Sequence, residues 1–244
     1  MYHSVTFGDK NTWTDWKLVP TSRPVVAPPE PKIKTVDIPG GDGVIDLTES
    51  LTGYPVFGRR TGSFEFIVLN DYHQPVDTVE EWHVTYSKIM NYLHGRQMEM
   101  SLEDDPNYWY EGRFKVDSWN SDKNYSTITI SYDVEPYKWL AYDSSIHSKS
   151  FTATTGYQSY EFLQNVNHLG DAPVTPTFVV STSSTNGVRI QFINNTIGIN
   201  TEQLIRNGTH QVPRMIFYGP RATIRYRSES GTVPFTVRWE EGSL

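Results

Sequence analysis

The sequence contains no cysteine among its 244 residues. This absence excludes disulfide bonds, thiolate nucleophiles and zinc sites built on cysteine. The sequence also lacks any run of about 18 apolar residues, and its start, "MYHSVTFGDK", has no apolar core of a secretion signal. We therefore expect a soluble protein that is made in the cytosol and has no membrane partner.

Signatures of catalysis are missing as well. The chain has no G-x-S-x-G nucleophile elbow, no H-E-x-x-H zinc helix and no Walker phosphate loop. Carboxylates cluster at three places: Glu80 and Glu81, Glu103 to Asp105, and Glu240 and Glu241. A glycosidase needs two carboxylates that converge across a cleft, and neighbours in sequence do not establish this. We predict no enzymatic activity, no cofactor, and no catalytic, cofactor-binding or metal-binding residue; a hydrolase built on a β-sandwich would need three titratable groups in one cleft.

The run "GGDGVID" at residues 40–46 begins like the dinucleotide-binding pattern G-x-G-x-x-G, with Gly41 and Gly43 as its first two glycines. The third glycine position holds Asp46, where that pattern needs glycine so that the helix packs closely on the strand. Gly-Asp-Gly is typical of a hairpin turn that requires positive φ angles. We predict a turn between two strands, "KTVDI" and "VIDLT".

The sequence is rich in segments that are typical of β-strands. Aromatic residues make up 14% of the chain, and strands favour aromatic side chains. In "STITISYDVEPY" apolar and polar residues alternate, so one face would carry Ile128, Ile130, Tyr132 and Val134. The segment "SFEFIVLN" at 63–70 is a further predicted strand, and its apolar run Phe66–Leu69 indicates burial on both faces.

Strands continue beyond residue 150, without any helical stripe. They include "PTFVVST", "VRIQFIN" and a final pair joined by a turn at "SESG". The apolar faces of that pair would carry Ala222, Ile224 and Tyr226 on the first strand, and Val233, Phe235, Val237 and Trp239 on the second. This half is predicted to be a β-sandwich.

One helix stands out in "DTVEEWHVTYSKIMNYLHG". Its apolar stripe, at steps of three and four residues, consists of Val79, Trp82, Tyr86, Ile89, Met90 and Leu93. Asp77 or Thr78 would cap its start, and Gly95 would end it. A single amphipathic helix in a strand-rich chain is expected to pack on a sheet. His83 and His94 beside it are expected to be surface or structural residues.

Five prolines fall within residues 20–31, "PTSRPVVAPPEP". Such a run cannot form a helix or a central strand. Two interpretations stay open at this point: a disordered linker, or an ordered extended loop that packs on a neighbour.

The chain divides into halves of different charge, with a domain boundary predicted near "WLAYDSS". Residues 1–140 carry 13 Lys and Arg against 21 Asp and Glu, a net charge of −8, and residues 141–244 carry 8 against 7, a net charge of +1. The acidic first half disfavours binding of nucleic acid through a basic patch.

The features of the chain occur in a definite order. The first half holds "VTFGDKNT", a proline-containing loop, "VDIPGGDGVIDLTESLTG", "RRTGSFEFIV", the helix ending in "NYLHGR", "NYWYEGRF" and "ISYDVEPYKW". The second half holds "NHLGDAPVTPTFVV" and ends in "VRWEEGSL". This ordered set, which spans nearly the whole chain, resembles the distal tail protein family of long-tailed phages and prophages of Gram-positive bacteria.

The resemblance implies a mainly β (α+β) fold with two domains. Residues 1–140 would be a ring-forming β-sandwich domain with one α-helix and a β-hairpin. Residues 141–244 would be a jelly-roll-like β-sandwich similar to galectins and carbohydrate-binding modules.

The resemblance also implies a structural component of the virion, located at the tail tip. Members of the family are not enzymes; six copies form a ring that joins the tail tube to the tail-tip or baseplate hub and lets DNA pass during ejection. The implied partners are further copies of the chain (a homohexamer), the major tail or tube protein, the tail-associated lysin or tail-tip hub, and a receptor-binding protein. No sequence-specific binding of nucleic acid is implied, and carboxylates around the lumen would repel DNA phosphates.

An alternative hypothesis is a carbohydrate-binding module for attachment to a cell surface. It requires exposed Trp or Tyr side chains in residues 141–244. Trp239 is in phase with residues that are expected to be buried, which disfavours this alternative.

Overall fold

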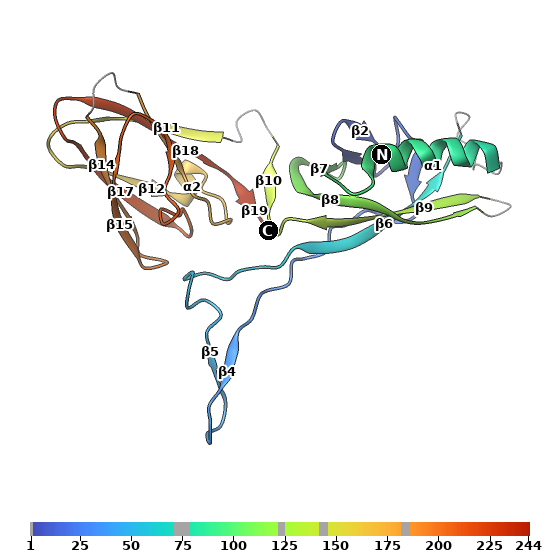
Figure 1. Ribbon diagram of the computed structural model, residues 1–244, viewed down its shortest axis with the longest axis horizontal. Helices are drawn as coiled ribbons and strands as arrows, with labels where there is room; N and C mark the ends of the chain where they lie inside the picture. Colours follow the sequence, from blue (N-terminus) through green and yellow to red (C-terminus); the bar gives the residue numbers. More distant parts are fainter. Residues whose placement is uncertain (1, 71–78, 122–124, 142–145, 182–185) are drawn as a thin grey trace. The chain divides into compact units, whose positions relative to one another are not determined.

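The computed structural model describes residues 2–70, 79–121, 125–141, 146–181 and 186–244 (Figure 1). Strands dominate it, which confirms the predicted mainly β class. The chain separates into two units: Met1–Pro31 with Phe57–Ala141, and Lys32–Val56 with Tyr142–Leu244. The segment Lys32–Val56, which the sequence placed in the domain 1–140, thus belongs by its contacts to the second unit.

The first unit is built on one antiparallel sheet with the strand order β2-β1-β7-β8-β9-β6-β3, and β10 pairs with β8. Its elements are β1 (Val5–Phe7), β2 (Lys10–Asn11), β3 (Leu18–Pro20), β6 (Arg60–Val68), α1 (Val79–Leu93), β7 (Arg96–Leu102), β8 (Asp105–Ser121), β9 (Ser126–Val134) and β10 (Lys138–Leu140). Helix α1 lies over one face of the sheet (Figure 1).

The covered face of this sheet follows from the alternation along its strands. On β9 the predicted residues Ile128, Ile130, Tyr132 and Val134 are all buried. On β6 one face is buried in the same way, but Ile67 and Leu69 are buried only in part. The predicted burial of both faces of β6 is therefore wrong, because only one side of this antiparallel sheet is covered and the other faces solvent.

Helix α1 buries its apolar stripe against the sheet. The described stripe residues are Trp82, Tyr86, Ile89, Met90 and Leu93. Trp82, Ile89 and Leu93 are at most 1% exposed, and the other two pack partly buried against the same core. The predicted stripe is confirmed for these residues, whereas the side chain of Val79 lies outside the described residues.

The predicted C-terminal end of the helix is confirmed. Gly95 has a φ of +76°, the left-handed conformation that ends helices and that glycine adopts without strain. The predicted cap at Asp77 or Thr78 lies outside the described residues. His94 is structural, as predicted, since its Nδ1 accepts a hydrogen bond from the backbone N–H of Val116 at 3.2 Å.

The proline-rich segment 20–31 is ordered and packs on the core of its own unit. Val26 is 8% exposed, and the backbone N–H of Ala27 donates to the hydroxyl of Tyr132 at 3.0 Å. The guanidinium of Arg60 donates to the Ala27 carbonyl at 3.4 Å. Of the two interpretations of this segment, the ordered loop holds, and its packing is on its own unit and not on a neighbour.

The second unit is a sandwich of two antiparallel four-stranded sheets, with the orders β11-β18-β13-β16 and β12-β17-β14-β15. Its elements are β4 (Thr35–Asp37), β5 (Val44–Asp46), β11 (Ile146–Ala153), β12 (Gln158–Leu163), α2 (Gln164–Asn167), β13 (Thr177–Val180), β14 (Val188–Asn194), β15 (Ile199–Ile205), β16 (Gly208–Gln211), β17 (Arg221–Ser228), β18 (Val233–Glu240) and β19 (Gly242–Ser243). The single turn α2 was not predicted, because four residues are too short to show a helical stripe.

The predicted pairing of the last two long strands is wrong. Strands β17 and β18 lie in different sheets, so "SESG" carries the chain from one sheet to the other and does not close a hairpin. Their apolar faces meet across the sandwich, where the ring centroids of Tyr226 and Phe235 are 5.1 Å apart. Facing sheets bury the apolar sides of both strands, which explains the arrangement.

Candidate functional surfaces

The hairpin β4–β5 exposes apolar side chains along its whole length. Exposed apolar residues in and beside it are Ile33, Val36, Ile38, Val44, Ile45, Leu47 and Leu51. Val36 and Ile45 lie directly opposite each other, on the same face of the ribbon. The turn has positive φ at Gly40 (+74°) and Gly43 (+87°), which confirms the predicted glycine turn. Strand β5 follows this turn at once, so the run does not open a helix as a dinucleotide-binding loop does.

Beyond β5, the segment that follows the hairpin packs on the sandwich of the same unit. The rings of Tyr54 and Tyr218 have centroids 4.9 Å apart. Gly53, at a φ of +75°, lies so close to Ile197 that an added Cβ would be 3.0 Å from its Cα. Isolated two-stranded hairpins are marginal in water, and exposed apolar ribbons mark sites that a partner covers. The hairpin is therefore a candidate interaction surface.

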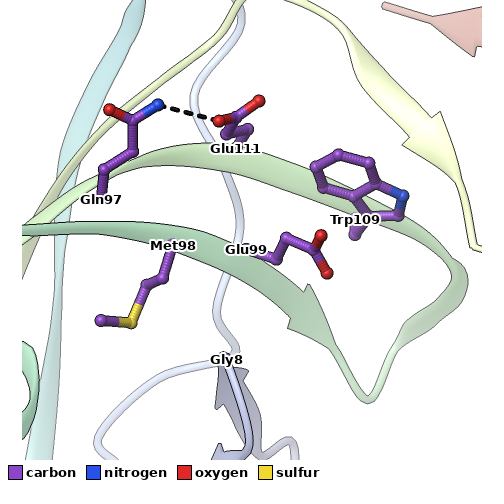
Figure 2. A pocket seen from close by; sticks show the side chains of 6 residues that line it. All are labelled: Gly8, Gln97, Met98, Glu99, Trp109 and Glu111. Carbon is purple, nitrogen blue, oxygen red and sulfur yellow. Dashed lines mark hydrogen bonds between the residues drawn. The ribbon is translucent and has the colours of Figure 1, made fainter.

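The solvent-facing side of the first unit's sheet carries two neighbouring carboxylates (Figure 2). Glu99 on β7 lies directly opposite Glu111 on β8, and Trp109 lines the same open depression of about 570 Å³. The side-chain amide of Gln97 donates to Glu111 Oε1 at 2.8 Å. Like charges directly opposite each other destabilise a sheet, so this face keeps negative charge at a cost in stability.

The acidic cluster at residues 103–105 has a structural explanation. Ser4 donates to Glu103 Oε2 from its backbone N–H at 2.8 Å and from its hydroxyl at 3.0 Å; the backbone hydrogen bond is the main cause that lowers the pKa of Glu103. Asp104 binds His3 at 2.9 Å and Arg23 at 2.8 Å, and the hydrogen bond from His3 is the main cause that lowers the pKa of Asp104. A general acid needs a raised pKa, and the pKa values of Glu103 and Asp104 are both lowered. The role of these two carboxylates is therefore structural: their contacts with Ser4 and His3 hold the N-terminal segment in place.

The other acidic pairs do not form a catalytic constellation within the described residues. Glu241 lies on the second unit, with its Oε2 3.1 Å from Nε2 of His147. The side chains of Glu80 and Glu81 are outside the described residues. No group of three or more His, Cys, Asp or Glu in the described ranges is placed to hold a metal ion. None of the helices described is long and apolar enough to cross a membrane.

The outer face of the sheet β12-β17-β14-β15 is rich in arginine. Arg225 on β17 lies in one cross-strand row with Ser159 on β12 and Gln191 on β14. Arg227 is the next outward-facing residue on β17, and its guanidinium carbon is 4.9 Å from the ring centroid of Tyr157. Sequence analysis missed this face, although the spacing of Arg221, Arg225 and Arg227 on one predicted strand was a visible signal.

Two aromatic residues bear on the carbohydrate-binding hypothesis. Trp239 is 4% exposed, and its Nε1–H donates to the carbonyls of Asn167 and His168 at 3.1 and 3.2 Å. It is a core residue, as its phase predicted. Tyr157, however, is 59% exposed, so the second unit does present an aromatic ring to solvent.

Among solved structures, the crystal structure of SPP1 Dit (gp 19.1) matches the chain. That protein is described as a paradigm of the hub adsorption apparatus in phages that infect Gram-positive bacteria. The match covers 100% of each chain, with a TM-score of 0.59 and 16% sequence identity. The two chains share one fold. No family model matches the sequence, and no curated protein does either.

The match with SPP1 Dit extends from the first residue to the last, so it includes the helix-bearing sheet, the hairpin segment and the sandwich. The resemblance to distal tail proteins, which rested on the order of short sequence features, is confirmed at the level of the fold. At 16% identity the likeness concerns the path of the chain and not its side chains.

Proposed function

We propose that the chain is a structural component of a phage tail, a ring of six copies at the tail tip that joins the tail tube to the tip or baseplate hub. The observation that carries this proposal is the full-length match in fold with SPP1 Dit, a hub protein. A fold without a catalytic constellation in its described part is compatible with a non-enzymatic role. The proposed partners are further copies of the chain, the tube protein, the tail-associated lysin or hub, and a receptor-binding protein.

The hairpin β4–β5 is the surface best suited to contact a neighbouring copy. The edge strands of the first unit's sheet are short: β2 has two residues, and β3 has three and ends in proline. Such edges are poor templates for pairing. The hairpin, by contrast, presents apolar side chains such as Val36 and Ile45, which are 43% and 51% exposed. Within residues 1–140, the proposed ring-forming part, it offers an exposed apolar surface that assembly would bury.

The exposed face of the first unit's sheet is proposed to line the passage for DNA. Glu99 and Glu111 place two carboxylates side by side on this face. Negative charge around a passage repels the phosphates of DNA and keeps the nucleic acid from adhering. In this proposal the repulsion between Glu99 and Glu111 is tolerated because their negative charge keeps DNA from adhering to the passage.

The ring is tested by measuring the mass of the full-length protein by light scattering across concentrations. We expect a monomer–hexamer equilibrium in the wild type and a monomer in the double variant Val36→Lys, Ile45→Glu, whose opposite charges face each other across the hairpin and do not destabilise it. The melting temperature of the monomer should be unchanged, because both side chains are exposed. Val166→Asp is the matched control, since Val166 is 65% exposed on α2, and this variant should assemble normally. A strict dimer at high concentration contradicts the six-fold ring.

A further inference from the structure

The arginine-rich face of the second unit has the composition of a ligand site. We infer that it binds an anionic saccharide, centred on Arg225 and Tyr157. This inference goes beyond the ring and does not depend on it. Residues that line the depression are Tyr157, Gln158, Ser159, Gln191 and Arg225, and its volume is about 490 Å³. Small-molecule sites have volumes of roughly 300–1,000 Å³, so the space suits a short saccharide.

The charges of this face are only partly compensated. Arg189 lies 3.3 Å from Glu202 and 3.7 Å from Glu229, and Arg221 lies 3.4 Å from Glu161. These two arginines are therefore paired within the protein and are not available in full to a ligand.

Arg225 and Arg227 differ from the paired arginines. Within the described residues no carboxylate lies within ion-pair distance of either, and Arg225 is exposed. The Nε of Arg227 is buried and has no hydrogen-bond acceptor in the described part of the chain. Arg227 also lies directly opposite Arg189 on β14. Because Glu202 and Glu229 already pair with Arg189, the charge that an anion bound over β17 would neutralise is that of Arg225 and Arg227.

The neighbouring side chains indicate what else the ligand contains. Guanidinium groups bind carboxylate or phosphate through paired hydrogen bonds. Ser159 and Gln191 stand on either side of Arg225 in the same row. Nε2 of Gln191 already donates to Oδ1 of Asn200 at 2.9 Å, so the carbonyl oxygen of Gln191 offers an acceptor and the hydroxyl of Ser159 offers a donor and an acceptor, as sugar hydroxyls require. Tyr157 is 59% exposed and provides an aromatic surface beside this row.

Nucleic acid fits this face less well. Proteins that bind DNA through its backbone neutralise on the order of six to ten phosphates. The face offers two arginines without carboxylate partners in the described residues, and the chain as a whole carries a net charge of −7. A short saccharide with one or two acidic groups matches that number of charges.

The test is titration calorimetry on the full-length protein with defined probes. An oligogalacturonate supplies carboxylates, a mannose-6-phosphate oligosaccharide supplies phosphates, maltotriose is neutral, and inorganic phosphate and single-stranded DNA complete the set. We expect at least one of the two anionic oligosaccharides to bind at least about tenfold more tightly than maltotriose and than inorganic phosphate. A comparison of the carboxylate and phosphate probes then identifies the acidic group.

Variants localise the binding. Arg225→Gln should weaken it at least about tenfold, and Tyr157→Ala should weaken it several-fold. Arg238→Gln is the matched control, because it removes the same charge from an exposed position of β18 in the opposite sheet and should leave the affinity unchanged. Light scattering reports the oligomeric state separately, so failure of the saccharide site and failure of the ring are distinguishable.

Four outcomes would overturn the inference. These are equal affinity for maltotriose, tighter binding of DNA than of either oligosaccharide, an equal loss in Arg225→Gln and Arg238→Gln, or no binding of the oligosaccharides at millimolar concentration. Because Arg225 is exposed, its variant should keep the wild-type melting temperature, which is measured alongside.

Discussion

The two units bury β-sheets in different ways. In the first unit one sheet is covered by a helix on one side and faces solvent on the other. In the second unit two sheets cover each other, and aromatic rings fill the core between them. The ring centroid of Phe217 is 4.8 Å from that of Phe162 and 5.6 Å from that of Trp239. The first arrangement concentrates stability in one helix and leaves a polar face free, whereas the second distributes burial over many strands.

The largest expected effect tests the dependence of the first unit on its helix. Trp82 is 1% exposed and contacts Tyr86 and Trp119, with ring centroids at 5.6 and 5.5 Å. Trp82→Ala should lower the free energy of unfolding of this unit by about 3–5 kcal/mol, as expected for truncation of a buried aromatic residue. Hydrogen exchange resolved by segment should show the loss in β6–β9.

A conservative variant and one contrary outcome test that prediction further. Trp82→Phe should cost under about 1.5 kcal/mol, because most of the ring volume is kept and the buried Nε1 of Trp82 has no acceptor within the described residues. If Trp82→Ala leaves the melting temperature of the monomer unchanged but abolishes assembly, the stripe serves another subunit and the contrast between the units fails.

A smaller effect is expected from the second unit, where the buried side chain of Asn194, the last residue of β14, binds the backbone of the segment that precedes β17. Asn194 is 0% exposed; its Nδ2 donates to the carbonyls of Ile216 and Tyr218 at 3.1 and 2.9 Å, and its Oδ1 accepts from Thr196 N–H at 3.1 Å. Asn194→Ala should cost about 1–3 kcal/mol in denaturant titration, because buried backbone groups lose their partner.

The matched control for this loss is Asn200→Ala, at an exposed position of β15. It should change the free energy of unfolding by less than about 0.5 kcal/mol. An equal cost for both variants would show that the buried network adds nothing to the stability of the sandwich.

The smallest effect concerns pH and belongs to the first unit. The pKa of Glu103 is lowered in the folded state, chiefly by the backbone hydrogen bond from Ser4. A lowered folded pKa contributes stability above the ordinary value of 4.5, and this contribution is lost as the pH falls through the folded pKa. Denaturant titrations below pH 4.5 should therefore show a steeper decline for the wild type than for Glu103→Gln; parallel declines would contradict the assignment.

Much of the local structure could be predicted from sequence because its causes are local. The stripe that contains Trp82, Ile89 and Leu93 has a helical period, and the burial on β9 has a period of two. Gly40 and Gly43 marked a turn that needs positive φ. Each of these signals lies within a few residues and needs no knowledge of distant neighbours.

The sequence by itself determined where helix α1 lies, which face of it is apolar, the hairpin β4–β5, and the apolar faces of strands such as β9, β17 and β18. Only the tertiary structure decided how strands that are distant in sequence are arranged: that β17 and β18 lie in opposite sheets, that Lys32–Val56 belongs with the second unit, and that Ser159, Arg225 and Gln191 form one row. The physical reason is that alternation fixes the side of a strand that is buried but carries no information on its partner. Partners are chosen by packing between residues that are far apart in the chain.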